Sequence, residues 1–97
     1  MAWMEMIQLR CTEPPRRLLG RELPAWAEEA RRSEGLAEFR AFVHAVFPGD
    51  LCLLLMWDAP RPGSGASPLG RGLVEVLKTA GLVDRSVWIE WLVEADE

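Results

Sequence analysis

The feature that most constrains this chain is an unbroken apolar run over residues 51–57, directly after the turn signal Pro48-Gly49-Asp50. The run is far too short to cross a bilayer as a helix, which needs about 20 apolar residues. A strand with apolar side chains on both faces is covered on both sides, so it lies in the middle of a sheet. The run therefore predicts a central strand, and the short turn predicts an antiparallel hairpin with the preceding segment.

Three other segments alternate between apolar and polar residues, which is the period of a strand. They cover residues 5–11, 37–47 and 85–94. The first ends before Pro14-Pro15, because proline supplies no N–H to a sheet and restricts the residue before it. The apolar side of the second consists of Phe39, Ala41, Val43 and Ala45. The sequence thus predicts four strands, of which 37–47 pairs with 51–57.

Two segments carry apolar residues at helical spacing. In residues 16–32 the apolar stripe consists of Leu19, Leu23, Trp26 and Ala30. Pro24 falls inside this stretch, so the regular helix either begins near it or is kinked there. Gly35 supplies the stop signal. The second helix is predicted over residues 69–80, capped by Ser67 or a neighbour, after an irregular loop at 58–68 that is rich in proline and glycine.

This order of elements predicts a ferredoxin-like α+β fold, βαββαβ, as a single domain over residues 1–97. Right-handed crossovers place both helices on one face of a four-stranded antiparallel sheet, with the first and third strands in the centre. The other face then receives Phe42, Val46, alternate residues of 51–57, and either Trp88 with Leu92 or Trp91 with Val93. Such an apolar face exceeds what a soluble monomer leaves in water, so we expect a sheet-to-sheet homodimer.

Composition argues against several partners. The 97 residues carry 11 basic and 15 acidic side chains, and the net charge of −4 gives no general attraction to nucleic acid or to a membrane surface. Cys11 and Cys52 lie in apolar segments without the spacing of a metal knuckle or a redox pair, so we expect buried thiols. No metal site and no cofactor are predicted. Reduced cysteines and the lack of a leader-like N-terminus predict a cytoplasmic protein.

On these elements the chain resembles the dimeric α+β barrel superfamily, and within it small proteins similar to antibiotic-biosynthesis monooxygenases. The resemblance covers nearly the whole chain and rests on the element order, on the hairpin with its Pro48-Gly49-Asp50 turn, and on the closing strand that holds Trp88. It implies a dimer in which two four-stranded sheets face each other. It also implies a cavity between helices and sheet, where enzymes of this family oxidise aromatic polyketides or degrade haem without a bound flavin.

Oxygenases of this family use combinations of Asn, Trp, Tyr, His and Arg around the pocket, whereas this chain contains no Asn and no Tyr. The remaining catalytic candidates are His44, Trp57 and Arg10, with Glu90 or Arg10 as the group that would orient His44. The candidate ligand-binding residues are Trp57, Asp58, Trp88 and Trp91. For the histidine and the tryptophans, ordinary packing or a surface position is the competing interpretation.

Three functions fit these residues. The first is a dimeric barrel protein that binds a small apolar or aromatic ligand without catalysis, which is favoured because the scaffold signals are clear and the catalytic ones are missing. The second is a cofactor-independent monooxygenase acting on an aromatic or quinone-like substrate, with His44, Trp57 and Arg10 in its pocket. The third is a regulatory ligand-sensing domain of the same topology that pairs edge to edge.

Overall fold

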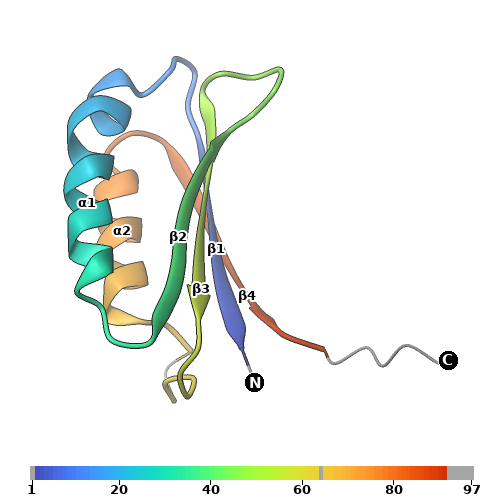
Figure 1. Cartoon of the computed structure of the whole chain (residues 1–97). Coiled ribbons are helices and arrows are strands. Elements are labelled where there is room, and N and C mark those ends of the chain that lie inside the picture. Colours follow the sequence, from blue (N-terminus) through green and yellow to red (C-terminus); the bar gives the residue numbers. More distant parts are fainter. Residues whose placement is uncertain (1, 64, 92–97) are drawn as a thin grey trace, which may run out of the picture.

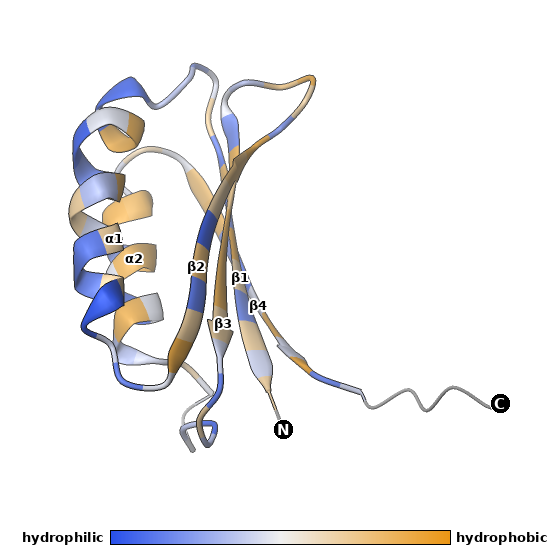
Figure 2. Ribbon diagram, viewed as in Figure 1, coloured by the Kyte–Doolittle hydropathy of each residue, from blue (hydrophilic) through white to orange (hydrophobic). Residues whose placement is uncertain are grey.

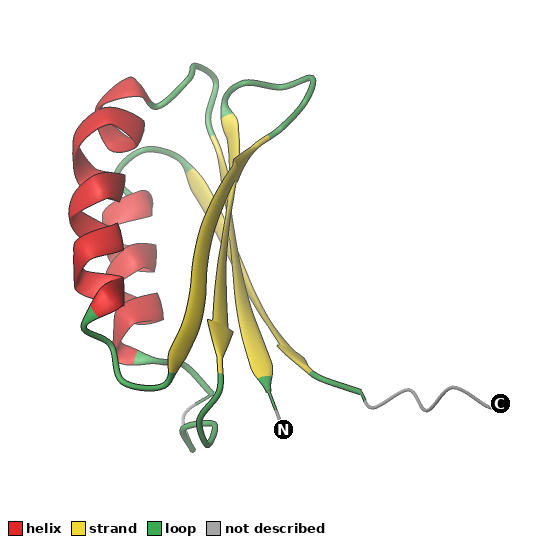
Figure 3. Cartoon of the chain, in the orientation of Figure 1, coloured by secondary structure: helices red, strands yellow, loops and turns green. Residues whose placement is uncertain are grey.

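The computed structural model describes residues 2–63 and 65–91. Its strands form one antiparallel sheet in the order β2-β3-β1-β4. Figure 1 shows both helices on one face of this sheet, and Figure 3 shows the loops that join the two layers. The predicted βαββαβ fold, with the first and third strands in the centre, is therefore confirmed. The strands are β1 (Trp3–Arg10), β2 (Leu36–Val43), β3 (Asp50–Trp57) and β4 (Leu82–Ile89).

The first helical segment accommodates Pro24 through a π-helical turn. Residues Leu18–Glu22 form this turn, and α1 (Leu23–Arg31) follows it directly. The N–H of Leu23 donates to the carbonyl oxygen of Leu18, five residues back. A wider turn makes room for the proline ring, which has no N–H and clashes with the preceding turn of a regular α-helix. The regular helix thus begins next to Pro24, which is one of the two possibilities that the sequence left open. It continues directly from the π-helical turn that precedes it.

The second helix, α2 (Pro68–Leu77), begins at the predicted cap. The hydroxyl oxygen of Ser67 accepts the N–H of Gly70 at 2.9 Å, and Pro68 occupies the first turn, where a missing N–H removes no helical hydrogen bond. The helix ends at Leu77 rather than at residue 80, and the chain turns through residues 78–81 into β4. Its buried side is formed by Leu69, Gly70, Leu73 and Leu77.

The second strand is shorter than predicted. β2 ends at Val43, and residues 44–47 belong to the turn. The cause is His44, whose Nδ1 accepts the backbone N–H groups of Val46 and Phe47, each at 3.0 Å, and so bends the chain. Val46, which the sequence places on the second sheet face, is instead 70% exposed in this turn.

The fourth strand begins and ends earlier in the sequence than predicted, at Leu82–Ile89 instead of residues 85–94. β4 begins at Leu82 because β1 offers pairing partners along its whole length, from Arg10 opposite Leu82 to Trp3 opposite Ile89. Trp91 therefore lies beyond the strand. Residues 92–94 of the predicted strand lie outside the described residues.

The sheet face under the helices forms the core. Alternate residues of the two central strands are buried there against α1 and α2, among them Ile7, Leu9, Leu53 and Leu55. Figure 2 shows hydrophobic residues concentrated on α2 and hydrophilic ones on the outer side of α1. No helix among the described residues is long and apolar enough to span a membrane.

The opposite face, called the open face below, is covered by no element of the described chain. On β3 it presents Cys52, Leu54 and Met56, each half-buried between neighbouring strands. Trp88 also lies on this face, because it pairs with Met4, which in turn pairs with Met56. Within one chain β3 is therefore covered on the helix side only, and cover on its second side would have to come from another molecule.

Candidate functional site

A charged residue lies inside the core. Glu5 of β1 is 0% exposed, because strand alternation places it on the helix side together with Ile7 and Leu9. Arg85 of β4 points to the same side, since its strand partner is Ile7. The guanidinium donates to Glu5 Oε2 from Nη2 at 2.7 Å and from Nε at 3.0 Å. These two hydrogen bonds place the positive charge of Arg85 next to the buried carboxylate of Glu5 and so balance its charge.

Two further residues complete what we call the Glu5 cluster: Glu5, Arg85, Trp57 and Ser67. The indole Nε1–H of Trp57 donates to Glu5 Oε1 at 2.9 Å. The Ser67 hydroxyl also donates to Oε1, and the Ser67 backbone N–H reaches Oε2 at 3.4 Å. Arg85 Nη2 donates in addition to the carbonyl oxygen of Gly65 at 2.5 Å. The cluster therefore joins β1, β3, β4, the end of the proline-rich loop and the start of α2.

The close approach of α2 to β1 depends on Gly70. A Cβ atom at this position would collide with the carboxylate of Glu5. Among the described residues, every buried side-chain nitrogen or oxygen has a hydrogen-bond partner. Both carboxylate oxygens of Glu5 thus accept hydrogen bonds, and these bonds position Trp57 and the cap of α2.

An apolar hollow lies beside the Glu5 cluster, and we call it the Trp pocket. The rings of Trp3 and Trp57 stack with centroids 5.6 Å apart and planes at 15°. Trp3 Nε1 donates to the carbonyl oxygen of Ala59 at 2.9 Å, which holds the loop over the rings. The hollow has a volume of about 300 Å³. It is lined by Trp3, Ser33, Glu34, Trp57, Ala59, Pro60, Pro62, Ser67, Pro68 and Leu69.

A second hollow, of about 510 Å³, adjoins the Trp pocket on the other side of Ala59 and Pro60. Asp58, Arg61 and Ile89 line it together with Trp3. Flat aromatic and proline walls offer contact area to planar apolar molecules. The pocket can therefore hold an uncharged ring system between the loop and the stacked indoles.

Of the residues predicted from the sequence, Trp57 lines the Trp pocket and Asp58 lines the adjoining hollow. Asp58 is exposed, and its backbone N–H donates to the carbonyl oxygen of Gly35 at 2.7 Å. Gly35 itself ends the turn after α1 with a φ of 84°, which glycine adopts without strain. Trp88 lies on the open face and is 54% exposed, and Trp91 is 84% exposed beyond β4.

His44 and Arg10 lie at the other end of the sheet from the Trp pocket. They share a hollow of about 620 Å³ with Asp50, which pairs with Arg10 across 3.6 Å. His44 Nδ1 is already occupied by the two backbone N–H groups of the turn. Glu90, the other predicted partner of His44, follows the opposite end of β4, where its N–H donates to Ala2. The structure therefore brings His44 and Arg10 together and separates both from Trp57.

The two cysteines are free and half-buried rather than fully buried as predicted. Partial burial raises the pKa of both thiols, because it disfavours the charged thiolate. At Cys11 the negative charge of Asp50 raises the pKa further. In the described part of the chain, no group of three or more His, Cys, Asp or Glu side chains could hold a metal ion.

Comparison with solved structures finds the same fold in proteins of low sequence identity. Rv0793 from Mycobacterium tuberculosis aligns with a TM-score of 0.67 and 19% identity over 99% of this chain and 100% of that one. A monooxygenase from the gene ActVA-Orf6 of Streptomyces coelicolor, in complex with the ligand Nanaomycin D, aligns with a TM-score of 0.69 and 13% identity over 99% of this chain and 93% of that one.

A conserved protein from Methanosarcina mazei Go1 also aligns, with a TM-score of 0.67 and 12% identity over 91% of each chain. No protein-family model matches the sequence, and the comparison with curated proteins gives no match. The chain thus shares the βαββαβ fold of these three proteins.

Replacing Arg85 by Met leaves the Glu5 carboxylate buried without its cation, and we expect the free energy of unfolding to fall by about 3–5 kcal/mol. Adding Glu5→Leu removes the second charge, so the double variant should lose much less than the sum of the two single losses. Urea denaturation of the four proteins measures this double-mutant cycle. Arg16→Met, at an exposed position before the π-helical turn, is the control and should change stability by no more than about 0.5 kcal/mol. Additive single effects would contradict the coupling.

The raised thiol pKa values predict slow alkylation at neutral pH and a rate that rises only in more alkaline solution than for an ordinary cysteine. Asp50→Asn removes one of the two causes at Cys11 and neither cause at Cys52. We therefore expect Cys11 to react faster with iodoacetamide at about pH 8 in this variant, while Cys52 keeps its rate. Peptide mass spectrometry distinguishes the two sites, and equal acceleration at both would show that Asp50 has no specific effect.

Proposed function

We propose that this protein is a homodimeric α+β barrel protein that binds a small aromatic or apolar ligand in the Trp pocket. The observation that carries the proposal is the hollow of about 300 Å³ between the stacked rings of Trp3 and Trp57 and the proline-rich loop. This volume lies at the lower end of the range for ligand sites, about 300–1,000 Å³, so it suits molecules of one or two rings. The adjoining hollow gives room for a substituent.

The polarity of the pocket supports an uncharged ligand. The carboxylate of Glu5 and the guanidinium of Arg85 neutralise each other behind the pocket wall, and the indole N–H groups of Trp3 and Trp57 are both already bonded. A charged ligand would lose hydration there without gaining an unused partner from these groups. A neutral aromatic molecule loses little hydration and gains apolar contact with the tryptophan, proline and leucine side chains that line the pocket.

A cofactor-independent monooxygenase is the second candidate. It is favoured by the fold shared with the Streptomyces coelicolor monooxygenase in complex with Nanaomycin D. Of the catalytic residues proposed from the sequence, Trp57 alone lines the Trp pocket, so His44 and Arg10 would have no part in such a reaction there. Oxygen uptake with a dihydroxynaphthalene separates the two candidates, because a binding protein takes up none.

The homodimer is proposed to form through the open face. This face carries Phe42, which is 45% exposed, and Trp88, which is 54% exposed, on its two outer strands. The central strands between them contribute half-buried apolar side chains such as Leu54. A two-fold contact would cover both copies of the same patch at once. The two free cysteines suit the reducing conditions of the cytoplasm, which we propose as the location of the protein.

For the ligand proposal, we expect 2-naphthol to quench tryptophan fluorescence with a dissociation constant on the order of 100 μM. Trp3→Phe and Trp57→Phe each reduce the stacking wall and should weaken binding about threefold to tenfold, provided that denaturation shows a folded protein. Trp88→Phe, on the other side of the sheet, is the matched control and should leave the affinity unchanged. Equal weakening by all three replacements, or no saturable binding, would refute the Trp pocket as the site.

For the dimer proposal, two neighbouring leucines of β3 give opposite expectations. Leu54→Asp places a charge on the open face, so we expect a folded monomer by circular dichroism and light scattering. Leu55→Asp places the same charge in the core and should prevent folding. A Leu54→Asp protein that remains a dimer would exclude pairing through this face and favour edge-to-edge pairing, as in a ligand-sensing domain.

A further inference from the structure

The hollow beside the Trp pocket carries two charges of opposite sign. Asp58 and Arg61 line this hollow of about 510 Å³, together with Trp3 and Ile89. Both charged residues are exposed, and neither takes part in a salt bridge within the described part of the chain, with each other or with a third residue. The hollow therefore offers a carboxylate and a guanidinium that the described residues leave without a charged partner.

The backbone that carries both charges is held in place. The N–H of Asp58 donates to the carbonyl oxygen of Gly35 at 2.7 Å. Arg61 stands between Pro60 and Pro62. Proline fixes its own φ and restricts the residue before it to extended conformations. Little backbone freedom is left to lose when a ligand binds, so the two charged groups are pre-organised.

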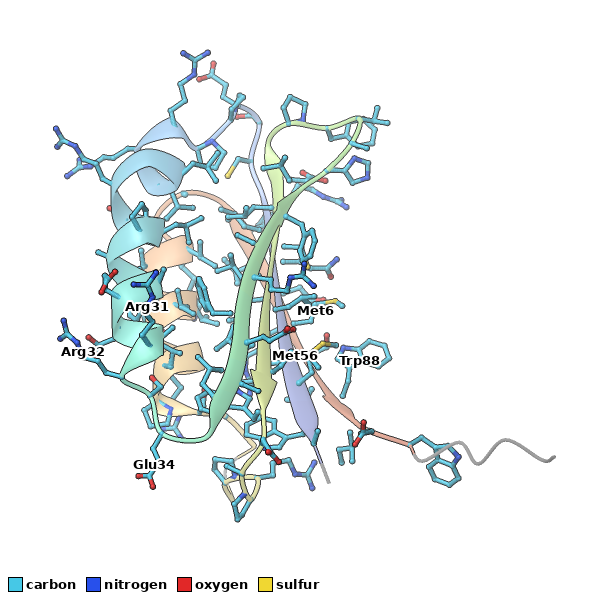
Figure 4. The ribbon with its side chains drawn as sticks, in the orientation of Figure 1. Met6, Arg31, Arg32, Glu34, Met56 and Trp88 are labelled. Carbon is cyan, nitrogen blue, oxygen red and sulfur yellow. The ribbon has the colours of Figure 1, made fainter. Side chains whose placement is uncertain are left out.

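The two hollows share a wall and lie on the helix side of the sheet. Trp3, Ala59 and Pro60 line both of them. Figure 4 shows Glu34, which also lines the Trp pocket, on the helix side of the sheet and Trp88 on the opposite side. A dimer that forms through the open face therefore does not cover this site.

We propose that the ligand of this site is an α-amino acid with an aromatic side chain. The ring enters the Trp pocket, while the headgroup stays in the adjoining hollow. There the ammonium group pairs with Asp58 and the carboxylate pairs with Arg61, whose planar guanidinium suits bidentate contact with a carboxylate. This inference rests on the proposed function, because it keeps the aromatic ring between the proline-rich loop and the stacked indoles.

The presence of both charges favours a zwitterion over a simple acid or amine. An acid that is attracted by Arg61 is repelled by Asp58 on the same hollow, and an amine meets the reverse combination. A headgroup that carries both charges gains from both residues and has no net charge. Single exposed ion pairs contribute little to affinity, so discrimination between ligands depends on the two contacts together.

The experiment compares four ligands that share a naphthalene ring. L-2-Naphthylalanine carries both charges, 2-naphthylpropionate lacks the ammonium group, 2-naphthylethylamine lacks the carboxylate, and 2-naphthol lacks both. Calorimetry at neutral pH and low salt measures the four dissociation constants. We expect the amino acid to bind about tenfold more tightly than 2-naphthol and more tightly than the acid or the amine.

Two variants separate the contacts to the headgroup. Asp58→Asn should weaken binding of the amino acid and of the amine about threefold, and Arg61→Met should weaken binding of the amino acid and of the acid by a similar factor. Neither variant should change the affinity for 2-naphthol. Arg16→Met is the matched control, because Arg16 lies at the start of the first helical segment, whereas the Trp pocket adjoins its end at Glu34. It should bind all four ligands as the parent does.

The outcomes distinguish this inference from the proposed function. If 2-naphthol binds and depends on Trp57, but the amino acid binds no more tightly than 2-naphthol, the acid or the amine, the inference is overturned and the Trp pocket remains the ligand site. Unchanged affinity for the amino acid in either headgroup variant has the same meaning. If none of the four ligands binds, or if Trp57→Phe leaves the affinity of all four unchanged, both proposals are overturned.

Discussion

The carboxylate of Glu5 lies out of contact with water, and its charge has to be balanced by groups from other parts of the chain. Arg85 supplies the opposite charge, and Trp57 and Ser67 supply the remaining hydrogen bonds. These partners come from β4, β3 and the start of α2. The sheet, the proline-rich loop and the second helix can therefore pack in one arrangement only, since any other leaves a buried charge without a partner.

The periodicity of the sequence was sufficient to predict the fold. The alternation of β1, the apolar β3 and the helical stripe of α2 each depend on neighbouring residues, and short-range patterns report such elements directly. The end of β2 could not be found in this way. Its last predicted residues alternate as a strand does, but the side chain of His44 binds the backbone two and three residues later and turns the chain.

The candidate site was only partly predictable, for a related reason. Trp57 was identified because it stands where a buried strand enters a loop. Glu5 and Arg85 were not identified, because their contact joins residues 80 positions apart in the sequence. The sequence around Arg85 has no pattern that indicates a buried ion pair. A signal did exist in Glu5, which shares the apolar side of an alternating strand with Ile7. A lone carboxylate on such a side predicts a buried partner, although it does not say which residue that is.

β1 serves both faces of the sheet in strict alternation. Trp3 and Glu5 face the helices and help to build the Trp pocket and its support, whereas Met4 and Met6 face the other way. A slip of one residue in its pairing would exchange the two sets and place thioethers in the core and the carboxylate on the open face. A point substitution in β1 can therefore change one face of the sheet and leave the other as it is. An insertion or deletion of one residue within β1 would disrupt both faces together.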